Sequence, residues 1–308
     1  AWMVLCRYEE PIKKIELAGA TMTLGNELTM NFVVDITLLN GEGHYAVVTK
    51  SYADRDPVSV TIPQSQWEVY RKSLYMFSFN GIAAKEMTDD ISVIVYNSEG
   101  VQVSEEWIDS VEKYSLRMLP RTNKAEEMRV FVDMLNYGAA AQQSFKYKTD
   151  DLANAELTEE QLAKGTQDIE LKNIRETGTG YAGTNLTLES KILLNIAFSN
   201  SVIDKAEYAM VTYTDHYGKA VEKRYEAEDF FVYSTSIKMV QIDVMAVADG
   251  RQSVTCKLYD AEGNVLSTVV DSVESYVCRK MEESILYEPI MKFAIGAYDY
   301  FRYLESLN

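Results

Sequence analysis

Seven aromatic residues stand in polar or repeated settings where a ring is able to stack on a ligand. Two come from "WEVY" at 67–70 and two from the aligned "FFVY" at 230–233. The others follow the acidic "SEE" at 104–106, lie in the turn-like "TDHYGK" at 214–219, or crowd the last helical stretch. An amphipathic ring at a wet interface suits the apolar C–H face of a sugar, while nearby amides and carboxylates hydrogen-bond the hydroxyls. The predicted ligand-binding set is therefore Trp67, Tyr70, Trp107, Tyr217, Phe230, Tyr233 and Tyr298. The alternative for each ring is ordinary packing in a core or on a sheet.

Motifs for catalysis, metals and cofactors give no positive signal. The chain has two histidines, His44 and His216, and neither has a cysteine or histidine partner at metal-ligand spacing. "GTGYAG" at 178–183 has dinucleotide-binding spacing but precedes the alternating "TNLTLES", whereas a true fingerprint follows a strand and opens a helix. No nucleophile-elbow motif or calcium loop is present. We therefore predict no catalytic residue, no metal site and no cofactor.

The net charge and the composition of the chain restrict which classes of partner it is able to bind. The net charge of −17 repels nucleic acid and anionic lipid, and no apolar run reaches the length of a membrane span. We expect neither nucleic-acid binding nor membrane insertion. Three cysteines do not make a disulfide framework. Free thiols at Cys256 and Cys278 are the favoured interpretation, and a bridge between them is the alternative. The chain begins with Ala1 rather than methionine, consistent with a mature or excised fragment.

An internal repeat organises the whole chain. "MTLGNELTMNFVVD" at 22–35 pairs with "LTLESKILLNIAFS" at 186–199, and "ISVIVYNSEG" at 91–100 pairs with "VTCKLYDAEG" at 254–263. "MLNYGAAAQQSFKY" at 134–147 pairs with "IMKFAIGAYDYFRY" at 290–303. A drifting offset in constant order indicates tandem duplication with loop insertions and deletions. We predict two modules, 14–165 and 166–308, after a leading segment, 1–13.

Each predicted module begins with strands. In 28–38 apolar residues occupy every even position from Leu28 to Leu38, and Ile192 to Phe198 repeats the alternation. This period of two indicates half-buried strands. "NSEG" at 97–100 and "DAEG" at 260–263 separate alternating runs and predict hairpin turns. No helix intervenes between these strands, so we expect antiparallel sheets in a sandwich.

Helices close each predicted module. "DSVE" at 109–112 and at 271–274 resembles a capping box before a helical stretch. The paired stretches at 134–147 and 290–303 lie in a second helix with apolar residues at spacings of three and four, and their central small residues permit close backbone approach. "LTEEQLAKG" at 157–165 predicts a short capped helix. The expected class is α+β: two tandem repeats, each an antiparallel β-sandwich followed by a small helical cluster.

Three blocks carry a family resemblance: "FNGIAAKEMTDDISVIVYNSEG" at 79–100, "DMLNYGAAAQQSF" at 133–145 and "TDDLANAELTEEQ" at 149–161. They resemble modules of secreted and cell-surface proteins of gut Clostridia, in which a β-sandwich precedes a helical cluster. Some such modules occur in starch-adherence proteins of amylosome complexes. The resemblance implies a secreted or cell-surface location, with a place in a larger cell-surface complex. The second module lacks "GIAAKEM" and has "VMAVADG" at 244–250 instead.

Together these features predict a non-catalytic extracellular carbohydrate-binding protein. The expected partner is a polysaccharide or oligosaccharide, with starch-like α-glucan favoured, held by aromatic residues in a groove formed by the two repeats. The alternative is a surface module that binds a host or bacterial protein, for example an immunoglobulin, because tyrosine and tryptophan also anchor protein interfaces. An enzyme is the least favoured class.

Overall fold

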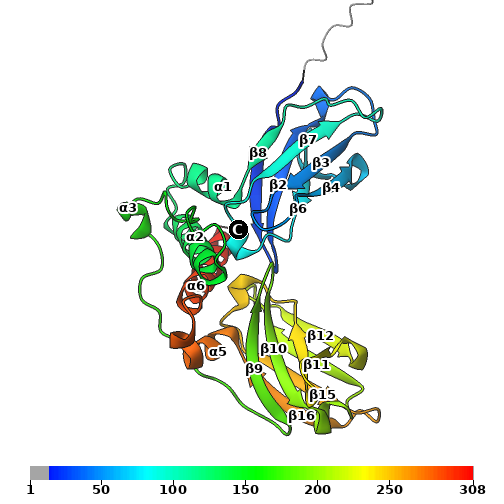
Figure 1. Ribbon diagram of the computed structural model, residues 1–308, viewed down its shortest axis with the longest axis vertical. Coiled ribbons are helices and arrows are strands. Elements are labelled where there is room, and N and C mark those ends of the chain that lie inside the picture. Colours follow the sequence, from blue (N-terminus) through cyan, green and yellow to red (C-terminus); the bar gives the residue numbers. More distant parts are fainter. Residues whose placement is uncertain (1–13, 308) are drawn as a thin grey trace, which may run out of the picture. The chain divides into compact units, whose positions relative to one another are not determined.

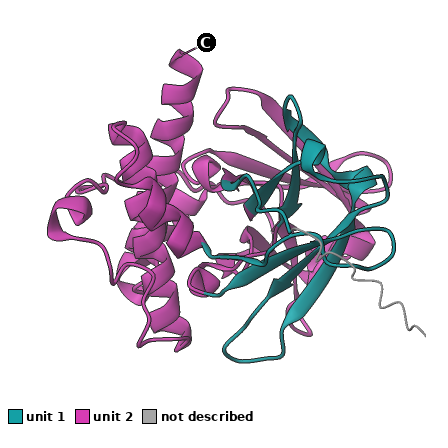
Figure 2. Cartoon of the chain, turned by 90° about the horizontal axis from the view of Figure 1, so that it is seen from above, with its two compact units in different colours: residues 1–21, 30–79, 89–110 teal, residues 22–29, 80–88, 111–308 magenta. Residues whose placement is uncertain are grey.

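A computed structural model describes residues 14–307 (Figure 1). The predicted leading segment 1–13 lies outside the described residues. The described chain forms four four-stranded antiparallel sheets with helices added to them, as expected for an α+β fold. It divides into two compact units: unit 1 is 14–21, 30–79 and 89–110 of the described chain, and unit 2 is 22–29, 80–88 and 111–307 (Figure 2). The predicted module boundary near residue 165 stays a prediction.

The first half of the chain contains eight strands and three α-helices within the described residues. Its sheets have the strand orders β1-β2-β6-β5 and β4-β3-β7-β8. The strands are β1 (Gly19–Leu24), β2 (Leu28–Asp35), β3 (Tyr45–Lys50), β4 (Val58–Pro63), β5 (Glu68–Arg71), β6 (Leu74–Phe79), β7 (Ile91–Tyr96) and β8 (Trp107–Asp109). The helices are α1 (Val111–Met118), α2 (Ala125–Phe145) and α3 (Glu159–Leu162).

The second half repeats this strand order, with sheets β13-β14-β10-β9 and β12-β11-β15-β16. The strands are β9 (Tyr181–Leu188), β10 (Ile192–Ser199), β11 (Tyr208–Thr214), β12 (Ala220–Glu226), β13 (Phe231–Val232), β14 (Ile237–Ile242), β15 (Val254–Tyr259) and β16 (Val265–Asp271). The helices are α4 (Asn200–Ile203), α5 (Val273–Lys280) and α6 (Tyr287–Ser306). Each strand of the first half therefore has a counterpart, eight positions later in the numbering of strands, at the same place in its sheet.

The alternating runs form the strands that they predict. In β2, Phe32 and Val34 are fully buried, and in β10, Ile196 and Phe198 are fully buried. The opposite face is buried as well, with Val33 4% and Ala197 5% exposed, so the predicted half-burial is wrong at the centre of both strands. A second part of the prediction is also wrong: residues 36–38 form a 3-10 turn, and Leu38 is 54% exposed. The Asp35 side chain accepts the Thr37 backbone N–H, which ends the strand. The predicted turns at 97–100 and 260–263 are confirmed by their closing hydrogen bonds.

The long helices α2 and α6 pack against each other in unit 2. The predicted small residues lie at close approaches. A Cβ added to Gly296 of α6 would lie 2.6 Å from Asp133 Oδ2 of α2, and one added to Gly138 would lie 2.6 Å from Met87 Sδ. The Tyr137 and Phe293 rings stack between the helices with centroids 6.1 Å apart. Glycine at these positions therefore lets helix α2 contact its neighbours without a clash.

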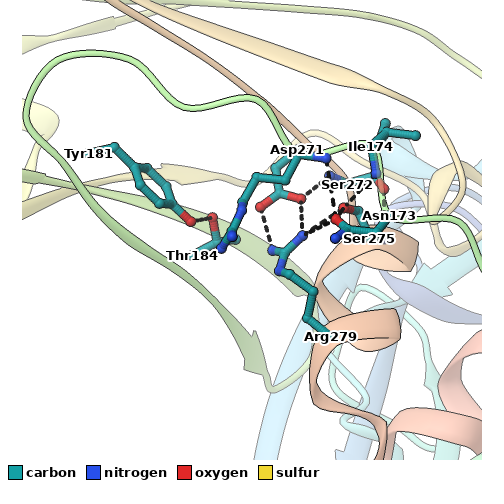
Figure 3. A network of polar contacts seen from close by, with 9 residues as sticks. Asn173, Ile174, Tyr181, Thr184, Asp271, Ser272, Ser275 and Arg279 are labelled. Carbon is teal, nitrogen blue, oxygen red and sulfur yellow. Dashed lines mark hydrogen bonds and ion pairs between the residues drawn. The ribbon is translucent and has the colours of Figure 1, made fainter.

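A polar cluster around Arg279 of α5 connects the segment from 166 to 180 to strand β16 in the second half of the chain (Figure 3). Arg279 donates to both carboxylate oxygens of Asp271, at 3.1 and 2.7 Å, and to Asn173 Oδ1 at 3.0 Å. Ser275 Oγ donates to the same Asn173 oxygen and accepts the Ile174 backbone N–H. Asp271 therefore binds Arg279 rather than capping the helix as predicted, and Ser272 is the N-cap instead.

Candidate functional site

A hollow of about 360 Å³ lies on the face of the β13-β14-β10-β9 sheet that is turned away from its core. All of its lining belongs to unit 2. The register explains this grouping, because Asn195 lies opposite Asn185 on one neighbouring strand and opposite Gln241 on the other. The lining residues are Asn185, Thr187, Glu189, Leu193, Asn195, Phe231, Tyr233, Met239 and Gln241. We call this feature the sheet hollow.

The floor of the sheet hollow is organised by Asn195, which is 1% exposed. Its Nδ2 donates to Asn185 Oδ1 at 2.7 Å and to Thr187 Oγ1 at 2.8 Å. With the amide in this orientation, Asn195 Oδ1 is a buried acceptor without a protein partner. An unsatisfied buried acceptor is costly. A ligand hydroxyl, or the Gln241 amide reoriented by a ligand, would satisfy it.

Two exposed rings stand at the sheet hollow. Phe231 is 48% exposed and Tyr233 is 60% exposed. Pairing of β13 with β14 puts Phe231 opposite Met239, and Tyr233 is held by its backbone N–H donating to Ile237 O at 3.1 Å. Glu189, in the β9–β10 turn, is the one charged side chain among the described lining residues. The hollow thus combines amides, a hydroxyl and apolar ring faces with little charge, which suits a neutral polyhydroxylated ligand.

The matching face of the first sheet, in unit 1, is built differently. Asn31 occupies the place of Asn195 and is 3% exposed. Its Nδ2 donates to Thr21 Oγ1 at 3.2 Å, and its Oδ1 accepts from Ser78 Oγ at 2.7 Å. Glu68 lies opposite Met76 where the second sheet has Phe231 opposite Met239. The first face therefore has a paired asparagine oxygen and a carboxylate where the second has an unpaired oxygen and a ring.

Of the seven predicted binding residues, Tyr233 lines the sheet hollow. Trp67 and Phe230 are each 6% exposed. The Trp67 Nε1 donates to Ile62 O at 3.1 Å, and its ring lies 5.2 Å from that of Phe77. Both residues directly follow 3-10 turns, which are closed by the Trp67 N–H donating to Gln64 O and the Phe230 N–H donating to Ala227 O. Their rings offer almost no free face, so we assign them to packing.

The remaining predicted rings are separate from the sheet hollow. Tyr70 is 44% exposed on β5, and Trp107 is half-buried on β8 with its Nε1 3.4 Å from Asp109 Oδ2. Tyr217 is 43% exposed and contacts His216, with ring centroids 4.1 Å apart. Tyr298 is half-buried on α6. The role of Trp107, Tyr217 and Tyr298 as ligand contacts stays a prediction. Tyr70 lies on the sheet whose asparagine oxygen is already paired, so we do not expect it to contact a sugar.

Sequence reasoning missed the polar half of the sheet hollow. The omitted residues are Asn185, Thr187, Asn195, Gln241 and the ring of Phe231. One signal was available: "ILLNIAFS" and "LTMNFVVD" each interrupt an apolar strand with an asparagine at the same place. A polar side chain in the middle of such a strand needs hydrogen-bond partners when it is buried.

His216 forms a pair that its isolation in the sequence did not indicate. Its Nδ1 lies 2.8 Å from Asp249 Oδ1, and the same oxygen accepts the His216 backbone N–H at 2.7 Å. The ring packs on Tyr217 and on Phe301, whose centroid is 4.6 Å away. The Nε2 atom is buried without a partner. The contacts of His216 with Asp249 therefore help to order the 214–219 turn.

Metal-binding clusters and membrane-spanning helices are both absent from the described residues. Within 14–307, no group of three or more histidine, cysteine, aspartate or glutamate side chains is arranged to hold a metal ion. Among the helices of that range, none combines the length and apolar character of a membrane span. Cys256 and Cys278 are both free thiols, as favoured. The expected burial is confirmed for Cys256, whereas Cys278 is half-buried.

Comparison with known proteins identifies no family. No family model matches the chain, and no curated protein matches it. Among solved structures, the FN1–FN3 domains of chicken CNTN1 align with a TM-score of 0.21 and 9% identity, covering 85% of this chain and 68% of that one. A pullulanase from Anoxybacillus sp. LM18-11, complexed with maltotriose, aligns with a TM-score of 0.18 and 10% identity, covering 81% of this chain and 25% of that one. Likeness at these TM-scores carries no argument about fold or ligand.

Proposed function

We propose that the chain is a non-catalytic carbohydrate-binding protein and that the sheet hollow receives neutral sugar rings. The observation that carries the proposal is the buried amide of Asn195, with an unpaired oxygen, beside two largely exposed rings. Sugar recognition needs donors and acceptors for hydroxyls together with an apolar face for C–H groups. The hollow supplies both with one carboxylate at its rim, so no charge on the ligand is required.

The finer parts of the proposal rest on the sequence. The family resemblance favours a starch-like α-glucan and a secreted or cell-surface location. The paired blocks favour two tandem repeats, and the matching strand orders of the two halves support that hypothesis. The groove formed by both repeats stays a prediction. Because the side-chain oxygen of Asn31 is paired and that of Asn195 is not, we expect the second half to carry the stronger sugar contact.

Affinity electrophoresis tests the proposal. The full chain is run through native gels containing amylopectin, other neutral polysaccharides or no polysaccharide, beside Tyr233→Ala and the matched control Tyr70→Ala. We expect retardation by a neutral glucan that Tyr233→Ala reduces and Tyr70→Ala preserves. Equal mobility of the wild-type chain in every gel would contradict carbohydrate binding. Retardation that Tyr233→Ala leaves unchanged would contradict the sheet hollow as its site.

A protein partner is the second candidate, and the edge strands favour it. Val232 of β13 is 64% exposed and Val69 of β5 is 63% exposed, each next to an exposed tyrosine. Exposed apolar residues on an edge strand suit strand addition by another chain. A pull-down with purified immunoglobulins and mucosal proteins separates the two candidates. Binding that survives excess maltooligosaccharide and fails in Val232→Lys would favour the protein partner.

A further inference from the structure

A second cavity, separate from the sheet hollow, lies among the helices of unit 2. Its volume is about 200 Å³, and its walls come from α1, α2, α6 and the end of β1. Four aromatic rings line it: Tyr114, Phe131, Tyr300 and Phe301. We call it the helical groove. At ~30 Å³ per water it has room for about seven water-sized groups, the scale of a small organic head group.

The rings of the helical groove are packed in two pairs. Tyr114 of α1 meets Phe131 of α2 edge-on, with centroids 6.1 Å apart. Tyr300 and Phe301 follow each other on α6, with centroids 6.0 Å apart. Tyr114 and Phe131 are 8% and 6% exposed, as little as the packed rings of Trp67 and Phe230, but unlike those rings they line a cavity, so the surface that they keep forms part of its wall. Fixed rings present their negative faces without a loss of side-chain entropy on binding.

Glu127 is the one charged side chain among the described residues that line the helical groove. It lies in the first turn of α2, where the helix dipole favours a carboxylate. The Thr122 Oγ1 donates to Glu127 Oε2 at 2.5 Å, which fixes the carboxylate. Burial raises the pKa of the Tyr300 hydroxyl, and the negative charge of Glu127 raises it further. The Glu127 carboxylate and the Tyr300 ring both line the groove and are close enough to influence each other's charge state.

One ring of the set is already occupied by a cation of the chain itself, so a ligand would depend mainly on the other three rings. The guanidinium carbon of Arg117 lies 5.5 Å from the Tyr114 centroid. Cations are attracted to ring faces within about 6 Å, most strongly where water is excluded. The net charge of −17 adds a long-range attraction for a positively charged ligand. An anionic ligand would meet Glu127 directly, and a neutral one would leave this carboxylate without a counter-charge.

We propose that the helical groove binds a small quaternary ammonium compound of about the size of choline. The methylated head contacts the rings of Tyr114, Phe131, Tyr300 and Phe301, and its charge faces Glu127. This activity is independent of carbohydrate binding, because the two cavities share no lining residue. A primary ammonium group suits the groove less well, since its three N–H donors would lose water without gaining acceptors on the rings.

Calorimetric titration of the full chain with choline, and with its neutral isostere dimethylbutanol, tests the proposal. Saturation-transfer NMR on the N-methyl protons reports the same contact directly. We expect choline to bind about tenfold more tightly than the neutral isostere, because the isostere keeps the shape and loses the charge. Ethanolamine, with a primary ammonium, should bind more weakly than choline.

Two substitutions in the first turn of α2 sharpen the test. Glu127→Gln keeps an oxygen for Thr122 and removes the charge, so choline binding should weaken about tenfold. Glu126→Gln is the matched control, because Glu126 is the preceding residue and does not line the groove. Thermal unfolding of each variant checks that the helices are intact. Absence of choline binding, equal binding of choline and its isostere, or equal effects of the two substitutions would each overturn the proposal.

Discussion

The β1-β2-β6-β5 and β13-β14-β10-β9 sheets each have a buried asparagine on the same face, but the two asparagines have different hydrogen-bond partners. Asn31 and Asn195 both interrupt an apolar strand and are both buried. Across the ladder, Asn31 meets Ser78, whose hydroxyl satisfies its oxygen, whereas Asn195 meets Gln241 and its oxygen has no partner. The residue opposite each asparagine is therefore the difference: serine pairs the Asn31 oxygen within the fold, whereas glutamine leaves the Asn195 oxygen free to accept a hydrogen bond from a ligand.

The closing helices differ in a comparable way. Helix α2 carries Asp133, which is 1% exposed and accepts the Thr166 backbone N–H at 2.8 Å and the Thr166 hydroxyl at 2.7 Å. At the aligned position, 156 residues later, α6 has Pro289. The first helix therefore holds the segment after α3 with a buried carboxylate, and the second helix has no equivalent group at that position.

The largest expected effect concerns Asp133. Burial raises its pKa from 3.8 to about 6, against the lowering effect of Thr166. The folded state therefore holds this proton more tightly than the unfolded state, so its contribution to stability is full below about pH 4 and is lost as pH rises through about 6. At ~1.4 kcal/mol per pKa unit, the contribution is up to about 3 kcal/mol.

Chemical denaturation of the wild-type chain and of Asp133→Asn, between about pH 4 and pH 7, measures this effect. The stability of the wild type relative to the variant should fall as pH rises. Asp168→Asn changes an exposed carboxylate in the same segment and serves as the control. A difference between wild type and Asp133→Asn that is independent of pH would contradict the assignment.

The next effect sets Asn195→Ala against Asn31→Ala. Either change removes a buried amide from its partners and should reduce stability by about 1–2 kcal/mol. Only Asn195→Ala should weaken binding of a neutral glucan, by about 10- to 100-fold at ~1.4 kcal/mol per decade. Affinity electrophoresis and thermal unfolding together separate the two effects. Similar loss of glucan binding in both variants would remove the distinction between the two faces.

A smaller effect is expected at the exposed rings. Tyr233→Ala should weaken glucan binding about tenfold, in line with the ~1–3 kcal/mol of ring stacking measured on bases. Tyr70→Ala should leave binding unchanged, because its sheet lacks the unpaired amide. Neither change should move the thermal midpoint much, since both rings are more than 40% exposed. A large loss of stability in Tyr233→Ala would instead assign that ring to packing.

The smallest effect tests the cross-strand exchange itself. Ser78→Ala removes a donor from Asn31 and should cost about 0.5–1 kcal/mol of stability. Gln241→Ala removes no hydrogen bond to Asn195 and should change stability by less than about 0.5 kcal/mol. Thermal unfolding of both variants is the measurement. The single change Ser78→Gln, which gives the first face the side chain found at Gln241, would then test whether that face gains glucan affinity.

The sequence predicted the regular elements well because each depends on nearby residues. Alternation identified β2 and β10, and the spacing of apolar residues identified the helices that contain 134–145 and 290–301. The strand was overextended at Leu38 because a local contact, from Asp35 to Thr37, ended it. The spacing of apolar residues contains no information about a side chain that hydrogen-bonds a nearby backbone N–H and so ends a strand.

The candidate site was harder to predict because it depends on register between distant strands. Asn185, Asn195 and Gln241 meet across β9, β10 and β14, and no short stretch of sequence contains all three. Ring type alone did not indicate that Trp67 and Phe230 are buried, because burial depends on contacts with distant residues, such as that of Trp67 with Phe77. The asparagines in the two apolar strands, Asn31 and Asn195, were the one sequence signal that could have indicated the site.

The segment from 166 to 180 also has a mechanical consequence. Asn173 and Ile174 are tied to the Arg279 cluster, and Glu176 exchanges two backbone hydrogen bonds with Val270, at 2.9 Å each. Under tension applied upstream of residue 166, these few contacts bear the load before the β9–β10 ladder does. The 15 residues of the segment would then extend by at most about 50 Å, at 3.3–3.6 Å per residue. Single-molecule stretching should therefore record a short extension at low force, before the sheets unfold. Arg279→Gln should move this extension to still lower force, because the substitution weakens the contacts that hold the segment.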